Sequence, residues 1–374
     1  MLSHYNLVAQ LFVPNVHARQ HVASSLARGE PAPSPMRTLA HVPVAHIAGV
    51  AGYFLVPMYA NGTVYWMGKF VWADFLRYFA RYKLTTLFSV PSIYLRIAKD
   101  PAVTDQFAHV EVALCGAAPM DAELQSAASR KLGGGKVKLA ATWGLSETTV
   151  RIYLSIHPSI LFPSPYPRLS QLIIFQGSVT GMPRGASDST GSLSPVLPNM
   201  SVRLVDASFA DVPPGQPGEL LVRGPFVTNG YFCDAGATAA AFHDGWFLTG
   251  DVAVERGGKL YIVDRKKELI KYKGLQVAPA ELEGVLVAHE GIEEAAVVGV
   301  EVPGEKGSEV PRAYVVRREG WGEKELGEED VRAWVEQRVA RYKWLRGGVR
   351  FVDEVPKNAV GKILRRELRE RARL

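Results

Sequence analysis

The stretch Asp264-Arg-Lys-Lys-Glu-Leu-Ile-Lys-Tyr-Lys-Gly-Leu-Gln-Val-Ala-Pro-Ala-Glu-Leu-Glu283 marks the beginning of a separate domain. After Asp264 and Arg265, apolar spacing predicts a helix, two strands and a second helix, over residues 279–289, 295–300, 313–316 and 328–342. This mixture is typical of an α+β domain, and its length is close to the smallest that folds alone. We therefore predict a compact α+β domain over residues 265–374.

The chain upstream of this domain shows two further patterns. Residues 191–263 consist of short alternating runs between turns rich in Pro and Gly, which favours a small antiparallel barrel or sandwich. The first 150 residues instead predict strands that alternate with helices. The expected strands cover 40–45 and 86–90 and begin again at 110, and the expected helices cover 72–82 and 120–131. This alternation is typical of an α/β domain.

The bulk composition narrows the class of protein. With 47% hydrophobic and 21% charged residues, the 374-residue chain has the balance of a globular protein. Its longest apolar stretch, residues 155–175, is interrupted by His157, Arg168 and four prolines, so no integral membrane contact is expected. Two cysteines cannot build a disulfide framework, which favours a reducing compartment. The basic C-terminal end contains interleaved acids without aromatic partners, so it predicts a solvated helix and no nucleic-acid site.

Six separated motifs occur in a fixed order along the chain. The first five are His46-Ile-Ala-Gly, Gly116-Ala-Ala-Pro, Trp143-Gly-Leu-Ser-Glu-Thr, Gly245-Trp-Phe-Leu-Thr-Gly-Asp and the run that starts at Asp264; the last is Pro356-Lys-Asn-Ala-Val-Gly-Lys-Ile-Leu-Arg-Arg. Each tetrapeptide alone is weak, but the run after Asp264 together with the downstream Gly-Lys is highly specific. The set resembles the adenylate-forming (AMP-binding) superfamily, which includes 4-coumarate–CoA ligases and acyl-CoA synthetases.

The resemblance implies a fold and a reaction. The fold would be a large N-terminal α/β domain with a small β-barrel over residues 1–264, incomplete here, followed by a small mobile C-terminal α+β domain. The reaction would activate a small-molecule carboxylic acid with ATP and Mg²⁺ to an acyl-adenylate, from which CoA then displaces AMP. Because an anion attacks an anionic phosphate, cations must stabilise the developing charge.

Two residues resemble the catalytic groups of this family. Lys362, which follows Gly361, resembles the lysine that reaches both the substrate carboxylate and the α-phosphate, a role suited to a point charge on a long stem. By composition alone it would be one more exposed lysine of a basic helix. His46 resembles the histidine beside the acyl carboxylate and the thiol path, although a lone histidine after an apolar strand is more often structural.

The nucleotide site implied by the resemblance draws on three motifs. Asp251 would accept hydrogen bonds from both ribose hydroxyls and Arg265 would be a second ribose contact, where an ordinary turn aspartate and a surface ion pair are the simpler readings. Glu147 would organise Mg²⁺. The remaining candidates would contact adenine or phosphate: Gly116, Ala117, Ala118, Trp143, Gly144, Ser146 and Gln276. Core packing is an equally good reading for Trp143.

The remaining candidates concern acyl transfer. Lys267 and Lys271 would contact the acyl-adenylate, and Lys69, Lys273 and Gly274 would contact CoA, although exposed lysines are usually just solvated. Asp264 resembles the hinge about which the C-terminal domain rotates between the two steps. The last three residues, Ala372-Arg-Leu374, resemble the Ser-Lys-Leu peroxisomal address read by an import receptor; without it, a cytoplasmic location is expected.

Two departures from the family pattern stand out. The Ser/Thr/Gly-rich loop that ends in Pro-Lys-Gly and cradles the outer phosphates does not occur in the sequence; in relatives it precedes a segment like Leu2-Ser-His-Tyr-Asn. We therefore expect the 374-residue polypeptide alone to be truncated at its N-terminus, inactive or unstable, with an open apolar face on its first domain. Residues 151–176 form an aperiodic apolar insert, which we interpret as translated intron sequence rather than a surface loop.

Rival hypotheses remain for the function. A peptide-synthetase adenylation domain would carry out the same first step, and a non-catalytic fragment or pseudoenzyme would account for the absent loop. Retention of Lys362, Asp251 and Arg265 favours a catalytic parent. The acid is not assigned, because Ala141-Thr142 and Ala48 replace residues common in coumarate ligases.

The source transcript, sequenced from upstream of Met1 through Gly177, tests both departures. We expect a spliced message that encodes the Thr/Gly-rich loop and lacks the insert. A message that matches the 374 residues throughout would contradict the intron interpretation and favour the non-catalytic reading.

Overall fold

The computed structural model describes residues 1–44, 46–116, 120, 122–148, 179–182, 186–273, 275–302, 305–358 and 363–372. These fold into two compact units. Unit 1 comprises Met1–Gln216, Leu220–Thr249 and Glu255–Tyr261, and unit 2 comprises Pro217–Glu219, Gly250–Val254 and Ile262–Leu374. The insert at 151–176 lies outside the described residues.

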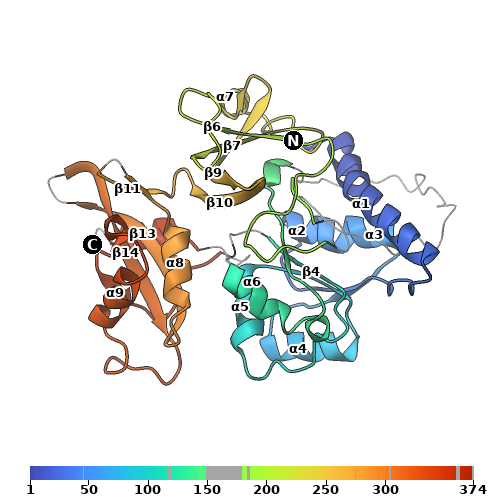
Figure 1. The fold of residues 1–374 in the computed structure, drawn as a ribbon, viewed down its shortest axis with the longest axis horizontal. Coiled ribbons are helices and arrows are strands. Elements are labelled where there is room, and N and C mark those ends of the chain that lie inside the picture. The colour runs from blue at the N-terminus through green and yellow to red at the C-terminus, as the bar shows by residue number, and fades with distance from the viewer. Residues whose placement is uncertain are drawn as a thin grey trace. The chain divides into compact units, whose positions relative to one another are not determined.

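A parallel sheet organises the first part of unit 1 (Figure 1). Its strand order is β2-β1-β3-β4-β5, and each neighbouring pair is parallel. The strands are β1 (Arg37–Ala40), β2 (Thr63–Trp66), β3 (Thr86–Ser89), β4 (Val112–Cys115) and β5 (Ala140–Ala141). Because the strands are parallel, their carboxyl ends meet at one edge of the sheet.

Helices between the strands bury apolar faces and confirm the predicted α/β alternation. Helix α4 (Trp72–Arg81) places Phe75 and Phe79, four residues apart on one face, in the core, where both are at most 1% exposed. Helix α5 (Pro91–Lys99) begins with a proline, whose missing N–H costs nothing at that position. It packs against α6 (Ala122–Ser129). The other helices of this region are α2 (Ile47–Val50), η1 (Ala51–Leu55), α3 (Val56–Ala60), η2 (Gly133–Gly135) and η3 (Ser146–Thr148).

One predicted strand was placed too far along the chain. Strand β1 covers Arg37–Ala40, whereas the apolar run predicted residues 40–45. Its ladder with β2 runs from the pair Arg37–Thr63 to the pair Ala40–Trp66. Beyond Ala40 the backbone turns, because Pro43 has no N–H to donate to a ladder and its carbonyl instead accepts the His46 N–H at 3.1 Å.

Helix α1 (His4–Ala27) was not predicted from the sequence. Ser3 and Asn6 form a capping box at its start, with the Asn6 N–H donating to Ser3 Oγ at 3.1 Å. One side of the helix exposes large apolar residues: Tyr5, Val8, Phe12 and Val16, which are 48–69% exposed. This stripe is an exposed apolar face of helix α1. Within the described ranges, no helix has both the length and the apolar character of a membrane span.

A second sheet follows along the chain. It contains β6 (Ser201–Val205), β7 (Pro217–Arg223), β9 (Trp246–Arg256) and β10 (Lys259–Arg265) in the order β10-β9-β7-β6, and β8 (Phe242–His243) pairs with β9. Helix α7 (Ala235–Ala240) lies between β7 and β8 in the chain. The sheet confirms that short strands occupy the region with Pro- and Gly-rich turns. Strands β9 and β10 each run from unit 1 into unit 2.

Unit 2 has the predicted mixture of helices and strands. Long strands β13 (Ile292–Val302) and β14 (Glu305–Arg317) pair in antiparallel fashion, and β15 (Val349–Phe351) joins β14 in parallel. Helices α8 (Pro279–Val287) and α9 (Glu328–Glu336) contact each other and contribute to the core cluster that contains Leu282, Val297 and Val331. The hairpin β11 (Ile270–Tyr272) and β12 (Leu275–Val277), η4 (Arg341–Lys343) and α10 (Arg365–Arg371) complete the unit.

The helix predicted over 328–342 is shorter in the structure. Helix α9 ends at Glu336, and Arg341–Lys343 form a separate turn of 3-10 helix after an extended Ala340. The two central strands are in turn longer than predicted, because ladder pairing extends past the apolar runs into charged residues such as Glu294, Glu301 and Glu309. Backbone pairing, rather than burial, sets these strand ends.

Candidate active site

The carboxyl edge of the parallel sheet gathers several polar residues of unit 1. His41 directly follows β1, Ser89 ends β3, Gly116 follows β4 and Thr142 follows β5. Parallel α/β sheets bind ligands in the crevice outside this edge. The candidates predicted from the Gly116, Trp143 and His46 motifs therefore share one edge of one sheet.

Gly116 and Trp143 are held close together by backbone contacts. The Gly116 N–H donates to Ser89 O at 3.2 Å, and the Thr142 N–H donates to Cys115 O at 2.8 Å. A Cβ at position 116 would lie 3.2 Å from Thr142 Oγ1, so a side chain there would be crowded. The Trp143 residue is 8% exposed, and its backbone N–H donates to Thr180 Oγ1 at 3.0 Å. The indole is therefore largely part of the core, with a small exposed fraction.

Glu147 is carried by the 3-10 turn η3. Thr148 Oγ1 closes this turn by accepting the Leu145 N–H at 2.8 Å. The Tyr231 hydroxyl donates to Glu147 Oε1 at 3.1 Å, and burial together with the Glu147 carboxylate raises the pKa of Tyr231. Gly144 is half-buried just before this turn, and Ser146, the first residue of the turn, is exposed.

Glu147 is a single carboxylate without a cluster of further metal ligands among the described residues. Within the described part of the chain no three His, Cys, Asp or Glu side chains gather as a metal cage. A single partly exposed carboxylate suits Mg²⁺, which keeps waters and substrate phosphates as its other ligands. Glu147 therefore fits a magnesium ion that enters with a nucleotide.

His46 lies in a tight turn after β1. Its carbonyl accepts the N–H groups of Gly49 and Val50 at 2.9 and 3.0 Å. A Cβ on Gly49 would lie 2.4 Å from the Pro43 carbonyl oxygen, so only glycine fits the His46-Ile-Ala-Gly turn. Partial burial lowers the pKa of His46 from 6.5, which keeps the imidazole neutral at pH 7.

A second histidine at the same edge was missed by the sequence analysis. His41 Nδ1 lies 2.9 Å from Leu39 O, and Nε2 lies 3.0 Å from Ser89 Oγ. Because a carbonyl only accepts, Nδ1 carries the proton and Nε2 accepts from the Ser89 hydroxyl. Burial lowers the pKa of His41 to about 4, so the ring is neutral at pH 7. No local signal could have identified this pair, because the strand predicted over 40–45 placed His41 inside a strand, whereas in the structure it follows β1.

Tyr53 holds the backbone beside His41. Its hydroxyl oxygen accepts the N–H groups of His41 and Val42, at 3.2 and 3.3 Å. Burial raises the pKa of this phenol to about 12. The polar groups at the end of β1 are thus neutral and mutually satisfied, which fixes the start of the turn that carries His46.

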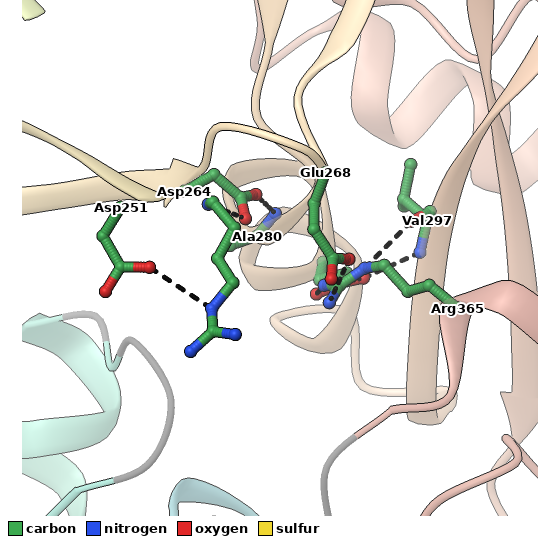
Figure 2. A network of polar contacts seen from close by, with 8 residues as sticks. Asp251, Asp264, Glu268, Ala280, Val297 and Arg365 are labelled. Atoms are coloured by element: carbon green, nitrogen blue, oxygen red, sulfur yellow. Dashed lines mark hydrogen bonds and ion pairs between the residues drawn. The ribbon is translucent and has the colours of Figure 1, made fainter. Parts of the chain in front are cut away.

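In unit 2, the structure brings the two predicted ribose contacts together. Asp251 lies on β9 and is 4% exposed, and Arg265 ends the adjacent strand β10. Arg265 Nε lies 3.2 Å from Asp251 Oδ1. Figure 2 labels Asp251 and draws this ion pair as a dashed line. Strand pairing therefore joins residues that are 14 positions apart in the chain.

Asp264, the predicted hinge, is buried and makes two hydrogen bonds through its carboxylate. Oδ1 accepts the Arg265 N–H at 2.7 Å, and Oδ2 accepts the Ala280 N–H at 3.0 Å (Figure 2). Ala280 lies in the first turn of α8, where backbone N–H groups lack helical partners. Burial raises the pKa of Asp264 even though these N–H donors favour the charged form.

The lysine candidates of unit 2 are exposed. Lys271 and Gln276 are direct partners across the β11–β12 ladder, which places them side by side. Lys273 occupies the hairpin turn with a positive φ of 46° and lies over the Tyr272 ring. Lys267 is exposed between β10 and β11, and Lys69 is exposed after β2 in unit 1. Ala117, Ala118, Gly274 and Lys362 lie outside the described residues.

Comparison with known families and proteins gives matches along most of the chain. The family model described as AMP-binding enzyme matches residues 1–232, and the model of the AMP-binding enzyme C-terminal domain matches residues 281–362. The chain is 45% identical to a putative acyl-coenzyme A synthetase of Emericella nidulans over 100% of its length. It is 37% identical to 4-coumarate–CoA ligase-like 9 of Oryza sativa over 99% of its length. It spans 61% and 60% of these two relatives.

Solved structures give a consistent result. The crystal structure of ATP-bound MatB from Rhodopseudomonas palustris matches with a TM-score of 0.78 and 27% identity, over 99% of this chain and 64% of that one. The anthranilate CoA ligase AuaEII, in complex with anthranoyl-AMP, matches with a TM-score of 0.75 at 22% identity, over 98% of this chain and 63% of that one. The second match shows a shared fold only.

The neutral His41 generates a prediction for stability at acid pH. Because its folded-state pKa of about 4 lies below the unfolded value of 6.5, its full contribution is present above pH 6.5 and is lost as the pH falls towards 4. We expect wild-type protein to lose about 2 kcal/mol more than His41→Gln between pH 7.5 and 5 in urea unfolding, since one pKa unit corresponds to about 1.4 kcal/mol.

The matched control is His4→Gln, which removes an exposed histidine and should leave the acid slope of wild-type protein unchanged. Equal acid slopes for His41→Gln and wild type would contradict the assignment of a buried neutral imidazole.

Proposed function

Because the chain belongs to the AMP-binding enzyme family, we propose that the protein acts as an acid–CoA ligase. In the first step a carboxylate oxygen attacks the α-phosphate of ATP, which forms an acyl-adenylate and releases pyrophosphate. In the second step the CoA thiol attacks the acyl carbon, a thioester forms and AMP leaves. The relatives named as acyl-CoA synthetase and CoA ligase support this reaction class.

The observation that carries the proposal is the Asp251–Arg265 pair. A buried carboxylate, oriented by a guanidinium 3.2 Å away, is already prepared to accept hydrogen bonds from the two hydroxyls of a ribose. Orientation before binding lowers the entropic cost of gripping a ligand. An aspartate that served only as a turn residue would need neither burial nor an arginine partner.

In unit 1, residues at the edge of the parallel sheet would contact adenine, phosphate and the acid. Gly116 leaves room for close approach of a planar base, and Trp143 offers the small exposed part of its ring. Glu147 would hold Mg²⁺, which supplies positive charge to the phosphates when bound. His46 is neutral and would hydrogen-bond the acyl carboxylate or the thiol without adding charge.

Cations in the C-terminal part would complete each step. Lys362 would place its ammonium between the carboxylate and the α-phosphate during adenylation, where two anions meet. Lys271 and Gln276, neighbours on one hairpin, would contact carboxylate or phosphate after rotation at Asp264. Lys267 would assist them, and Lys69, Lys273 and Gly274 would contact CoA.

Substitution of Asp251 tests the nucleotide site directly. We expect Asp251→Asn to weaken AMP binding by roughly tenfold to a hundredfold in isothermal titration calorimetry, because hydrogen bonds to a charged group contribute about 1.5–3 kcal/mol. AMP is the right probe, because its single phosphate does not need a loop for the outer phosphates.

Asp211→Asn is the matched control, since that carboxylate is 68% exposed and pairs with Arg203 on the surface. It should bind AMP as the wild type does. Unchanged AMP affinity in Asp251→Asn, or no AMP binding by a folded wild type, would count against the ligase proposal.

We further propose that Ala372-Arg-Leu374 acts as a peroxisomal address. Ala372 follows helix α10, and Arg369 and Arg371 precede the tripeptide with basic charge. A fluorescent reporter that carries the last twelve residues or so should enter peroxisomes, and removal of Leu374 should return it to the cytosol. A cytosolic reporter with the intact tail would exclude this address.

A further inference from the structure

Arg365 is a largely buried arginine of unit 2 that contacts two carboxylates and a backbone carbonyl. Its side chain is 13% exposed, and Nη2 donates to both oxygens of Glu283, at 2.6 and 2.8 Å. Nη1 lies 3.3 Å from Glu268 Oε2, and Nε donates to the Val297 carbonyl at 3.4 Å (Figure 2). The Glu268 contact is an ion pair rather than an aligned hydrogen bond, because Oε2 has no hydrogen-bond donor.

Both carboxylates that contact Arg365 belong to segments that are connected to Asp264, the predicted hinge. Glu268 follows Asp264 by four residues in the chain. Glu283 lies on α8, and the first turn of α8 donates the Ala280 N–H to Asp264 Oδ2. Two separate connections, one through the chain and one through a helix, thus join the Asp264 carboxylate to the Arg365 guanidinium.

On its other side, Arg365 begins helix α10, three residues after Lys362 in the sequence. The described residues on the two sides of Lys362 pair with each other through their backbones. Ile363 pairs with Lys357 in an antiparallel bridge, and the Leu364 N–H donates to Pro356 O at 2.8 Å. Lys357 Nζ lies 2.6 Å from Glu294 Oε1 on β13. The two ends of the segment that contains Lys362 are therefore both tied into unit 2.

The positive charge of Arg365 compensates the negative charge of nearby carboxylates. Three carboxylates, those of Asp264, Glu268 and Glu283, surround one guanidinium. Burial raises the pKa of Glu283 despite the nearby arginine. Although burial disfavours its charge, Glu283, Glu268 and Asp264 raise the pKa of Arg365. Removing the guanidinium would leave buried carboxylates without compensation, which is strongly unfavourable.

We propose that Arg365 is a positioning residue, which fixes Lys357, Ile363 and Leu364, the described residues on either side of Lys362, relative to Asp264. The inference rests on the proposed catalytic role of Lys362. It assigns to Arg365 no contact with substrate. Its purpose would be to hold the chain on both sides of Lys362 in one place relative to Asp264, since an error of about 1 Å is costly in catalysis.

Hydrogen exchange of the 374-residue chain tests this link without any need for turnover. We expect Arg365→Gln to speed amide exchange of Lys357, Ile363 and Leu364 roughly tenfold or more, because the segment loses its tie to α8. Acylation of amines, read by mass spectrometry, should change the labelling of Lys362 relative to exposed Lys324 by about threefold or more. Arg365→Lys, which keeps the charge, should restore both readouts in part.

Arg366→Gln is the matched control, because this neighbouring arginine is 92% exposed and pairs only with Glu370 one turn away among its described contacts. It should change neither readout. If Arg365→Gln does not fold, Arg365→Lys and Glu268→Gln decide, since the latter breaks only the hinge-side contact and should raise exchange at Ile363 and Leu364.

Three results would overturn the proposal: unchanged exchange in all Arg365 variants, an unchanged Lys362 labelling ratio, or exchange that rises equally throughout α8 and β13. The last would mean that Arg365 stabilises the unit without positioning the segment. These outcomes are independent of AMP binding by Asp251→Asn, so the failure of this inference is distinguishable from failure of the ligase proposal.

Discussion

The parallel alignment of β1, β3, β4 and β5 is the constraint on which the unit 1 site depends. Parallel pairing sends every chain segment out of the sheet at the same edge, so residues far apart in sequence become neighbours. The backbone at this edge must still satisfy its polar groups. It does so through Ser89 O and Cys115 O, which accept N–H groups from the adjoining segments. The result is a rigid platform with Gly116, Trp143 and His46 at its rim.

A different constraint governs unit 2, where buried charge has to be balanced. Burial disfavours the charged forms of Asp264 and Glu283, and the positive charge of Arg365 offsets part of this penalty. An apolar cluster of the same size would have been easier to bury. Charged groups make specific, directional connections, however, and these connections join the strand end at Asp264, the start of α8 and the start of α10.

Much of this organisation could be predicted from local sequence. Helices α4 and α8 and strands β3 and β4 follow from apolar spacing, and the motifs correctly indicated the family. Strand β1 was misplaced because Pro43 and the turn at His46 end the ladder earlier than hydrophobicity suggests. Helix α1 escaped prediction because apolar residues occur on both of its sides: Leu11 packs on a core cluster and Val22 is buried, whereas Val8, Phe12 and Val16 are about half exposed. A periodic pattern reports burial only where a partner surface exists.

The contacts that local sequence could not reveal are those between distant polar residues. His41 and Ser89 are 48 positions apart, and Arg365 and Glu283 are 82 apart, and neither pair has a local signature. The pairs differ in charge in a way that bears on the chemistry. In unit 1 the polar groups around the candidate acyl site are neutral, since burial lowers the pKa of both histidines, and Glu147 adds negative charge. An attack of one anion on another cannot be stabilised by such groups alone. In the proposed ligase, positive charge would come from Mg²⁺ and from lysine side chains, and among the proposed acyl and phosphate contacts these are Lys267, Lys271 and Lys362. If the protein is a ligase, its anion-stabilising charge therefore lies mainly in the part of the chain that follows Asp264.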